Sequence, residues 1–405
     1  MKNKQRLLVI AIMVLGSSLI FNTGCKKDPE VIDPGTSTTD LLAKSFATAP
    51  AIDGTIDDMW EECQDLTGTA IVPDAGSRGA ADFNGDGSDG PVGVFDPYTG
   101  EENDFNLRAG TFGDKIYFLL EWDDVEDSKD RQSWYFDATD NRWKGQQKYA
   151  NDVNDKYYED KFAFLWAATT VQGFDVNTCY ATCHQGLTVT NLGDKSARHY
   201  TNNEGEVVDM WHWKRVRCSV EPTVIDDQQM IYKEHTGDAG VNGRTGDEGD
   251  AGYHGNSQTL QLDGTGAEVS VPLYIIPGST DYYWITITQI DNGTAKMITA
   301  VATDGTLTYD GGTINPADGG YEKGTRNKRF PSVWLENFTG SKADLSCSAV
   351  HTGSGWVVEF SRKLNTGNAD DVVFDVTKDF AFGLALFNNA AIAHEIKTNL
   401  ILKFE

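Results

Sequence analysis

The chain has 405 residues and a formal net charge of −27 at pH 7, from 34 basic and 61 acidic side chains. So acidic a surface repels nucleic acid and anionic membranes, which excludes both as partners bound by charge. The apolar content of 39% is sufficient for a substantial core, and 41 glycines indicate many turns. The length allows two domains, but β domains of this size also occur as one.

The first 24 residues have the features of an export signal. Three basic side chains precede an apolar stretch, residues 7–20, which is too short to span a bilayer comfortably. Gly24-Cys25 follows, and a small residue before a cysteine is typical of a bacterial lipoprotein cleavage site. We expect removal of residues 1–24, lipidation of Cys25 and anchoring in the cell envelope, at the outer membrane. The alternative is an ordinary secretory signal that is cut nearby.

Residues 25–41 are polar and predict a flexible tether before a folded region at 42–405. Short runs of β-branched and aromatic residues follow with frequent turn signals, which predicts an all-β sandwich. Two stretches rich in Gly and Asp, about 74–103 and 236–266, are expected to be surface loop insertions. The clearest hairpin has its arms at 107–112 and 115–122. Further strands are expected at 160–166, 207–216, 269–276, 283–290, 297–302, 356–361, 380–387 and 399–404.

Cys179-Tyr-Ala-Thr-Cys183-His184 carries the most specific chemistry in the sequence. In the C-x-x-C-H motif of c-type cytochromes each thiol bonds one haem vinyl group, and the adjacent histidine binds the iron. This chain has one additional residue between its cysteines. The alternative is a disulfide, or two unrelated cysteines, beside an exposed histidine. With haem attached, Cys63, Cys218 and Cys347 would be left as one disulfide and one odd thiol.

A haem iron with two protein ligands needs a second donor, and His394 and Lys397 are the candidates near the C-terminus. Strand alternation puts Trp211 and Trp213 on one face of their strand and His212 on the other. The two tryptophans either wall a cofactor or a sugar, or belong to the core, which is the commoner role. His212 is expected to be a satisfied structural side chain rather than an iron ligand.

Asp82-Phe-Asn84-Gly-Asp86-Gly87 begins like a calcium-binding loop. The twelfth position of that loop is Gly93 instead of the glutamate that such loops require. A solvated acidic loop is therefore favoured over a calcium site. The order of residues shows no catalytic triad, P-loop or zinc-binding helix of the known patterns.

Taken together, these segments resemble the haem-binding domain of the γ subunits of ethylbenzene dehydrogenase and related dimethylsulfoxide-reductase-type enzymes, and its stand-alone c-type relatives. The resemblance implies a DOMON-like, immunoglobulin-like β-sandwich that holds one haem between its sheets. The segments that carry it run through nearly the whole mature chain: Ala51-Ile-Asp53-Gly54 with Trp60, Leu107-Arg-Ala with Tyr117-Phe-Leu-Leu-Glu-Trp122, Tyr158-Glu-Asp160-Lys-Phe-Ala-Phe, Cys179 to Gly186, Trp211-His-Trp213-Lys214, and Trp356 to Leu364 followed by Phe382-Gly-Leu-Ala-Leu-Phe387.

In the b-type relatives an axial methionine stands near the place of His184, and a lysine stands near residues 394–397. The cysteines of this chain instead favour a covalently attached, c-type haem with His184 as a ligand. His394 is preferred over Lys397 as the second ligand, because exported c-type haems so often have two histidine ligands. The resemblance thus implies an electron-transfer protein rather than an enzyme, with a multihaem cytochrome or a molybdoenzyme as its redox partner.

The opening segment Ile52-Asp53-Gly54, with Asp58 and Trp60, also resembles the start of family 9-like carbohydrate-binding modules. This gives a rival hypothesis, a surface lipoprotein that binds glycans through exposed Trp and Tyr side chains. The haem hypothesis explains the two cysteines and His184, and the carbohydrate hypothesis does not.

Overall fold

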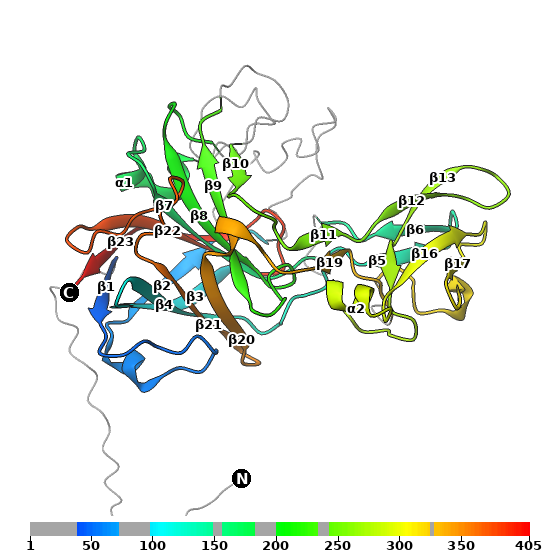
Figure 1. The fold of residues 1–405 in the computed structure, drawn as a ribbon, viewed down its shortest axis with the longest axis horizontal. Helices are drawn as coiled ribbons and strands as arrows, with labels where there is room; N and C mark the ends of the chain where they lie inside the picture. The colour runs from blue at the N-terminus through cyan, green and yellow to red at the C-terminus, as the bar shows by residue number, and fades with distance from the viewer. Residues whose placement is uncertain (1–38, 73–97, 149–155, 183–199, 234–242, 325–327) are drawn as a thin grey trace, which may run out of the picture. The chain divides into compact units, whose positions relative to one another are not determined.

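The computed structural model describes residues 39–72, 98–148, 156–182, 200–233, 243–324 and 328–405. The fold is almost entirely β, which confirms the all-β prediction. Its main sheet has twelve strands (Figure 1). They are β1 (Asp40–Ser45), β2 (Leu66–Ile71), β3 (Glu102–Phe112), β4 (Lys115–Asp123), β7 (Lys161–Ala167), β8 (Val207–Lys214), β9 (Val224–Ile231), β10 (Arg244–Gly246), β20 (Leu345–His351), β21 (Gly355–Lys363), β22 (Phe380–Phe387) and β23 (Glu395–Phe404).

The main sheet closes on itself. Its strands follow the order β1-β23-β2-β3-β4-β21-β20-β9-β8-β7-β22, and β22 pairs back to β23. Closure satisfies the backbone hydrogen bonds that an open sheet would leave at its edges. β1 lies outside the ring and pairs in parallel with both β23 and β3. β1 begins at Asp40, so the last residues of the expected tether belong to the sheet, because Leu41 is buried in the core.

The predicted hairpin forms as expected between β3 and β4. Gly113 supplies the left-handed backbone conformation of the turn, with φ of 61°. The pairing runs from Phe105 opposite Trp122 to Phe112 opposite Lys115. This register puts both Phe105 and Trp122 on the inner face. A shift by one residue would expose the buried side chains of one strand, so burial determines the register.

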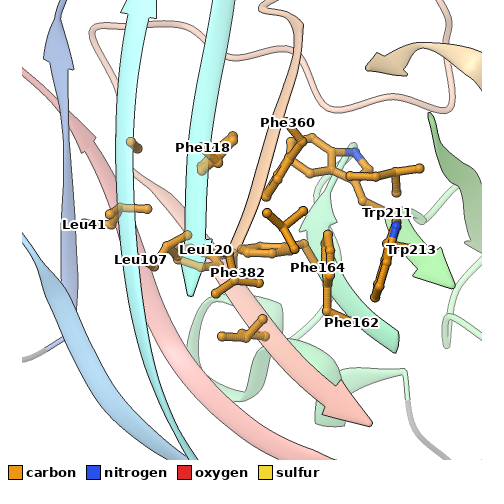
Figure 2. Close-up of a cluster of buried hydrophobic side chains, with 14 of the residues drawn as sticks. Leu41, Leu107, Phe118, Leu120, Phe162, Phe164, Trp211, Trp213, Phe360 and Phe382 are labelled. Atoms are coloured by element: carbon orange, nitrogen blue, oxygen red, sulfur yellow. The ribbon is translucent and has the colours of Figure 1, made fainter. Parts of the chain in front are cut away.

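Aromatic side chains fill the interior of the closed sheet (Figure 2). Trp166 stacks on Phe382 at 4.7 Å between ring centroids, and Phe118 stacks on Phe360 at 5.1 Å. Such pairs add about 0.5–1.5 kcal/mol each beyond the burial of their area. They come from β4, β7, β21 and β22, so the core ties together strands that are far apart in sequence.

A second group of strands has its own hydrophobic cluster, which includes Trp143, Leu307 and Phe330. Its members are β5 (Trp134–Asp137), β6 (Arg142–Gly145), β12 (Gln258–Gln261), β13 (Glu268–Val271), β14 (Tyr274–Ile275), β16 (Lys296–Val301), β17 (Leu307–Tyr309) and β18 (Gly312–Ile314). A separate three-stranded sheet consists of β11 (Tyr253–Gly255), β15 (Ile285–Thr286) and β19 (Val333–Leu335), and β19 packs against Val216 in another small cluster.

Two segments differ from the sequence-based expectation. The stretch 236–266, expected to be a loop insertion, contains β10, β11 and β12, although residues 234–242 lie outside the described part. The strand expected at 283–290 is wrong beyond its first residues. There β15 is followed by helix α2 (Ile287–Asp291), because Thr286 and Gln289 form a reciprocal cap that begins a helix.

The remaining helical segments are short. They are α1 (Phe174–Asn177) and the 3₁₀ turns η1 (Asp58–Glu62), η4 (Thr178–Ala181), η5 (Pro316–Asp318) and η6 (Gly340–Ala343). In the described part of the chain, no helix combines the length and the apolarity that a membrane crossing requires.

Candidate functional site

Cys179 lies on the outside of the closed sheet, in the turn η4 that follows α1. It packs beside β22, where a Cβ atom added to Gly383 would come within 3.4 Å of the Cβ of Cys179. Glycine at position 383 therefore allows the cysteine segment to approach the strand closely. Cys183 and His184 lie outside the described residues.

The strand registers define the surface on which Cys179 sits. Three rows of directly paired residues cross β22, β7 and β8 on the side turned away from the aromatic interior, and we call this side the outer face. The rows are Gly383–Leu165–Met210, Ala385–Ala163–His212 and Phe387–Lys161–Lys214. The residues at 383, 385 and 163 are small, and both alanines are buried in a hydrophobic cluster with Leu165 and Met210.

His212 lies in the middle row and is 4% exposed. Neither of its ring nitrogens has a hydrogen-bond partner in the described structure. Burial lowers the pKa of His212 well below its usual range, and the nearby charges of Lys214 and Lys161 lower it further. The expectation of a satisfied structural histidine is therefore wrong. Among the described residues, His212 is a neutral imidazole without a hydrogen-bond partner, and such a group can bind a ligand.

His394 belongs to the same side of the sheet. The ring of His394 stacks on Phe387, with 4.6 Å between the ring centroids. The ring of His212 stacks on Phe387 as well, at 5.8 Å. Nδ1 of His394 lies 2.5 Å from the carbonyl oxygen of Ile392. Burial lowers the pKa of His394 to about 4, so the ring is neutral at pH 7. With Nδ1–H donated to the carbonyl, Nε2 carries the free lone pair, as in metal-binding histidines.

Lys397 lies on the opposite side. It belongs to β23 rather than to the turn before it, because this strand begins at Glu395. Lys397 pairs directly with Leu384, which is part of the interior cluster. Directly opposite residues share a face of the sheet, so Lys397 points inward while Cys179 lies outside.

Trp211 and Trp213 also face inward, as strand alternation predicts. Both belong to the interior cluster, and Trp213 stacks on Phe162 at 5.7 Å between ring centroids. Figure 2 shows both side chains among the aromatic rings of the core. Cys179 packs against a different cluster, on the other side of the sheet. Cys179 therefore lies beside the outer face and not beside the interior of the closed sheet.

Basic side chains gather at one end of the outer face, in a protein that is strongly acidic as a whole. We call this group the cationic cluster: Lys161, Lys214, Arg131, Arg217 and Lys342. Glu159 pairs with Arg217 at 2.6 Å and with Arg131 at 3.1 Å. Asp226 pairs with Lys214 and, at 3.0 Å, with Lys342. In the described part of the chain, Glu159 and Asp226 thus each pair with two of these basic side chains.

Lys161 is the member of this cluster that has no ion pair in the described structure. Its side chain is 2% exposed. Nζ donates to the carbonyl oxygen of Ala391 at 3.1 Å and lies 4.0 Å from the ring centroid of Phe387. Burial lowers the pKa of Lys161 well below its usual range, and the charge of Arg217 adds to this effect. The sequence contained a signal for this residue, a lysine in an otherwise apolar strand, which we did not interpret.

A separate group of acids lies in the interior. Asp209, Asp227 and Asp371 each place one carboxylate oxygen within 4.8 Å of the others. Nη1 of Arg362 reaches Asp209 at 2.7 Å, Asp371 at 3.5 Å and Asp227 at 3.9 Å. Burial, and then the charge of Asp209, raise the pKa of Asp227 well above its usual range. The guanidinium of Arg362 is thus the cation of this group.

The other cysteines are not paired as expected. Cys63, Cys218 and Cys347 are free in the described structure, so the expected disulfide is wrong. Cys218 and Cys347 both belong to the interior cluster, and burial raises the pKa of Cys218 to about 12. They are neutral thiols in an apolar core. Cys25 and the candidate calcium loop at 82–93 lie outside the described residues.

The outer face fits a haem group on its own residues. A thiol, two neutral imidazoles and small side chains at 163, 383 and 385 lie on one side of the sheet, and His212 has no hydrogen-bond partner among the described residues. Thiols can bond vinyl groups, and neutral imidazoles can bind iron. Fold and site together define an all-β protein with a thiol–imidazole surface on one face of its closed sheet.

The family model described as ethylbenzene dehydrogenase matches residues 89–398. This is more than half of the chain, so the chain belongs to the ethylbenzene dehydrogenase family. One similar solved structure is a carbohydrate-binding module family 9 from Caldicellulosiruptor kristjanssonii in complex with glucose. It is 8% identical, with a TM-score of 0.26, over 90% of this chain and 95% of that chain, and a likeness so weak carries no argument. The comparison with curated proteins gives no match.

The burial of the Asp247 carboxyl can be tested through the pH dependence of stability. Asp247 is 5% exposed, and neither carboxyl oxygen has a hydrogen-bond partner in the described part. Burial and the charge of Asp370 raise its pKa from 3.8 to about 8. The folded chain therefore keeps a proton that the unfolded chain has lost between these two values. The free energy of unfolding accordingly falls as the pH rises through this window.

Asp247→Asn cannot lose a proton, so we expect it to be more stable than the unmodified protein at pH 8, with a flatter pH dependence. Urea denaturation at several pH values between about 5 and 8 measures this. Asp263→Asn, at an exposed position, is the matched control. Equal pH dependence in the unmodified protein and Asp247→Asn would show that the carboxyl is not buried as described.

Proposed function

We propose that this protein is an exported, lipid-anchored haem protein that transfers electrons, with one c-type haem on the outer face of β22, β7 and β8. The observation that carries the proposal is the position of Cys179 on the same sheet face as two neutral imidazoles, those of His212 and His394. Membership of a family named after an oxidoreductase supports the redox role.

In this proposal Cys179 and Cys183 hold the haem through thioether bonds, and His184 binds the iron. The parts given to Cys183 and His184 rest on their spacing in the sequence. The part given to Cys179 is supported by its packing against Gly383, beside the small residues Ala385 and Ala163 of the same face. Bound haem supplies an iron that gains and loses one electron.

His394 is the second ligand that we propose. Its Nδ1 is engaged by the carbonyl of Ile392, which fixes the ring and leaves Nε2 available. Lys397 is less suited than His394, because its pairing with Leu384 directs it to the interior. An iron with two protein ligands has no open site for substrate, so we propose electron transfer and not catalysis.

The partner is a redox protein, either a multihaem cytochrome or the molybdoenzyme with which family members are associated, as the family match supports. The lipid on Cys25 would hold the domain at the membrane while its acidic surface stays in water. The rival glycan-binding function needs exposed aromatic side chains, whereas Trp60, Trp211 and Trp213 are buried. No described feature favours it.

The first test concerns covalent attachment. Protein produced with c-type maturation machinery should keep its haem through acid–acetone extraction, because thioether bonds survive this treatment. The double variant Cys179→Ser, Cys183→Ser should release it, whereas Cys63→Ser, outside the motif, should not. The haem content of the extracted polypeptide is measured by absorbance. Free extraction of haem from the unmodified protein would refute covalent attachment.

The second test concerns the axial ligand. We expect His394→Ala to convert a low-spin haem spectrum to a high-spin one and to open the iron to carbon monoxide. Lys397→Ala and His212→Ala should both remain low-spin, because neither supplies the ligand. If the low-spin spectrum survives in His394→Ala, the single variant that becomes high-spin identifies the ligand instead.

The third test concerns the anchor. Cys25→Ala should abolish acyl labelling and release the protein from the membrane fraction, because the amphiphilic lipid is its only proposed attachment. Labelling with a radioactive fatty acid and fractionation of the cells measure both effects. Membrane fractionation that is unchanged in Cys25→Ala would exclude lipidation at this residue.

A further inference from the structure

The cationic cluster lies at the end of the outer face opposite to Cys179. Along β22 the thiol packs at Gly383, and the cluster begins beside Phe387, which pairs with Lys161. Four residues of strand separate these two positions, about 13 Å at a rise of about 3.3 Å per residue. The two edges of a haem differ in a corresponding way, because its vinyl groups lie at one edge and its two propionate carboxylates at the other.

The side chains of Lys161, Lys214 and His212 are neighbours at this end of the outer face, as the pairing of β7 with β8 shows. Lys161 pairs directly with Lys214, and His212 lies two residues before Lys214 on the same face of β8. Both lysines are almost fully buried, and so is His212. Lys214 already pairs with Asp226, and Lys161 donates to the carbonyl oxygen of Ala391. Among the described residues, His212 has no hydrogen-bond partner and Lys161 has no carboxylate partner. A buried polar group without a partner is costly.

We propose that Lys161, Lys214 and His212 bind the propionate carboxylates of the haem. This inference rests on the proposed function and adds an orientation to it, with the vinyl edge at Cys179 and the acidic edge at the cationic cluster. The carboxylates would place an acceptor beside His212 and an anion beside Lys161, which among the described residues have neither. The N–H of His212 and the ammonium of Lys161 would donate to them.

The test uses the matured holoprotein and three variants. Lys161→Met removes the ammonium while filling the same buried space, and His212→Phe removes the ring nitrogens. Lys378→Met is the control, since Lys378 has an exposed side chain and pairs only with Asp375 nearby. Resonance Raman spectra report the hydrogen bonding of the propionates through their bending bands, and potentiometric titration gives the midpoint potential.

We expect Lys161→Met and His212→Phe to shift the propionate bands. Lys161→Met should also lower the midpoint potential, because an uncompensated carboxylate stabilises ferric iron. Both variants should stay low-spin, Lys161→Arg should restore the unmodified spectrum and potential, and Lys378→Met should change neither. Circular dichroism checks that each variant is folded.

Unchanged propionate bands in both variants, with haem still attached, would overturn this inference and leave the proposed function standing. Absence of haem from the matured unmodified protein would overturn both. If added phosphate shifts the potential of the unmodified holoprotein and Lys161→Met removes that shift while the propionate bands stay constant, the cluster binds a free anion and the propionate assignment is wrong.

Discussion

The filling of the closed sheet by aromatic rings is the constraint on which the rest of the structure depends. Trp166, Phe164 and Phe382 are fully buried, and they contact partners from several other strands. Protein interiors at this packing density have no room for a group the size of haem. We therefore propose the haem site on the other side of the same strands. The period of two in a β-strand makes this possible, because alternate residues of β7 and β8 can serve the core and the outer face independently.

The same division separates two kinds of buried charge. Inside the sheet, Arg362 is surrounded by carboxylates, and outside it Glu159 and Asp226 are surrounded by cations. Each arrangement is costly in isolation, since ions lose their hydration when buried. The interior group is balanced locally by its guanidinium and by raised carboxyl pKa values. The outer group has an excess of positive charge against a chain that is acidic overall, so charge composition alone gives no indication of it.

Much of the fold could be predicted from the sequence, because its strands carry strong local signals. The β3–β4 hairpin and the strands β7, β8, β21 and β22 follow from alternation and from Gly113-Asp114. The helix α2 could not be predicted in the same way, since its reciprocal cap overrides the β propensity of Ile287 and Ile290. For the site, alternation correctly separated His212 from its neighbouring tryptophans. That Lys397 faces inward depends on a register shift between Phe382 and Leu384, which no local pattern reveals.

The position of β1 has a mechanical consequence. This strand is the first described element after the N-terminal segment, and it is held in parallel between β23 and β3. A force applied to the N-terminus acts along β1 and therefore across its hydrogen bonds, which must break together rather than one at a time. Strands loaded in this shear geometry resist pulling better than strands that are peeled from an end. If the proposed anchor holds the N-terminus, a pull on the domain therefore loads β1 in this shear geometry.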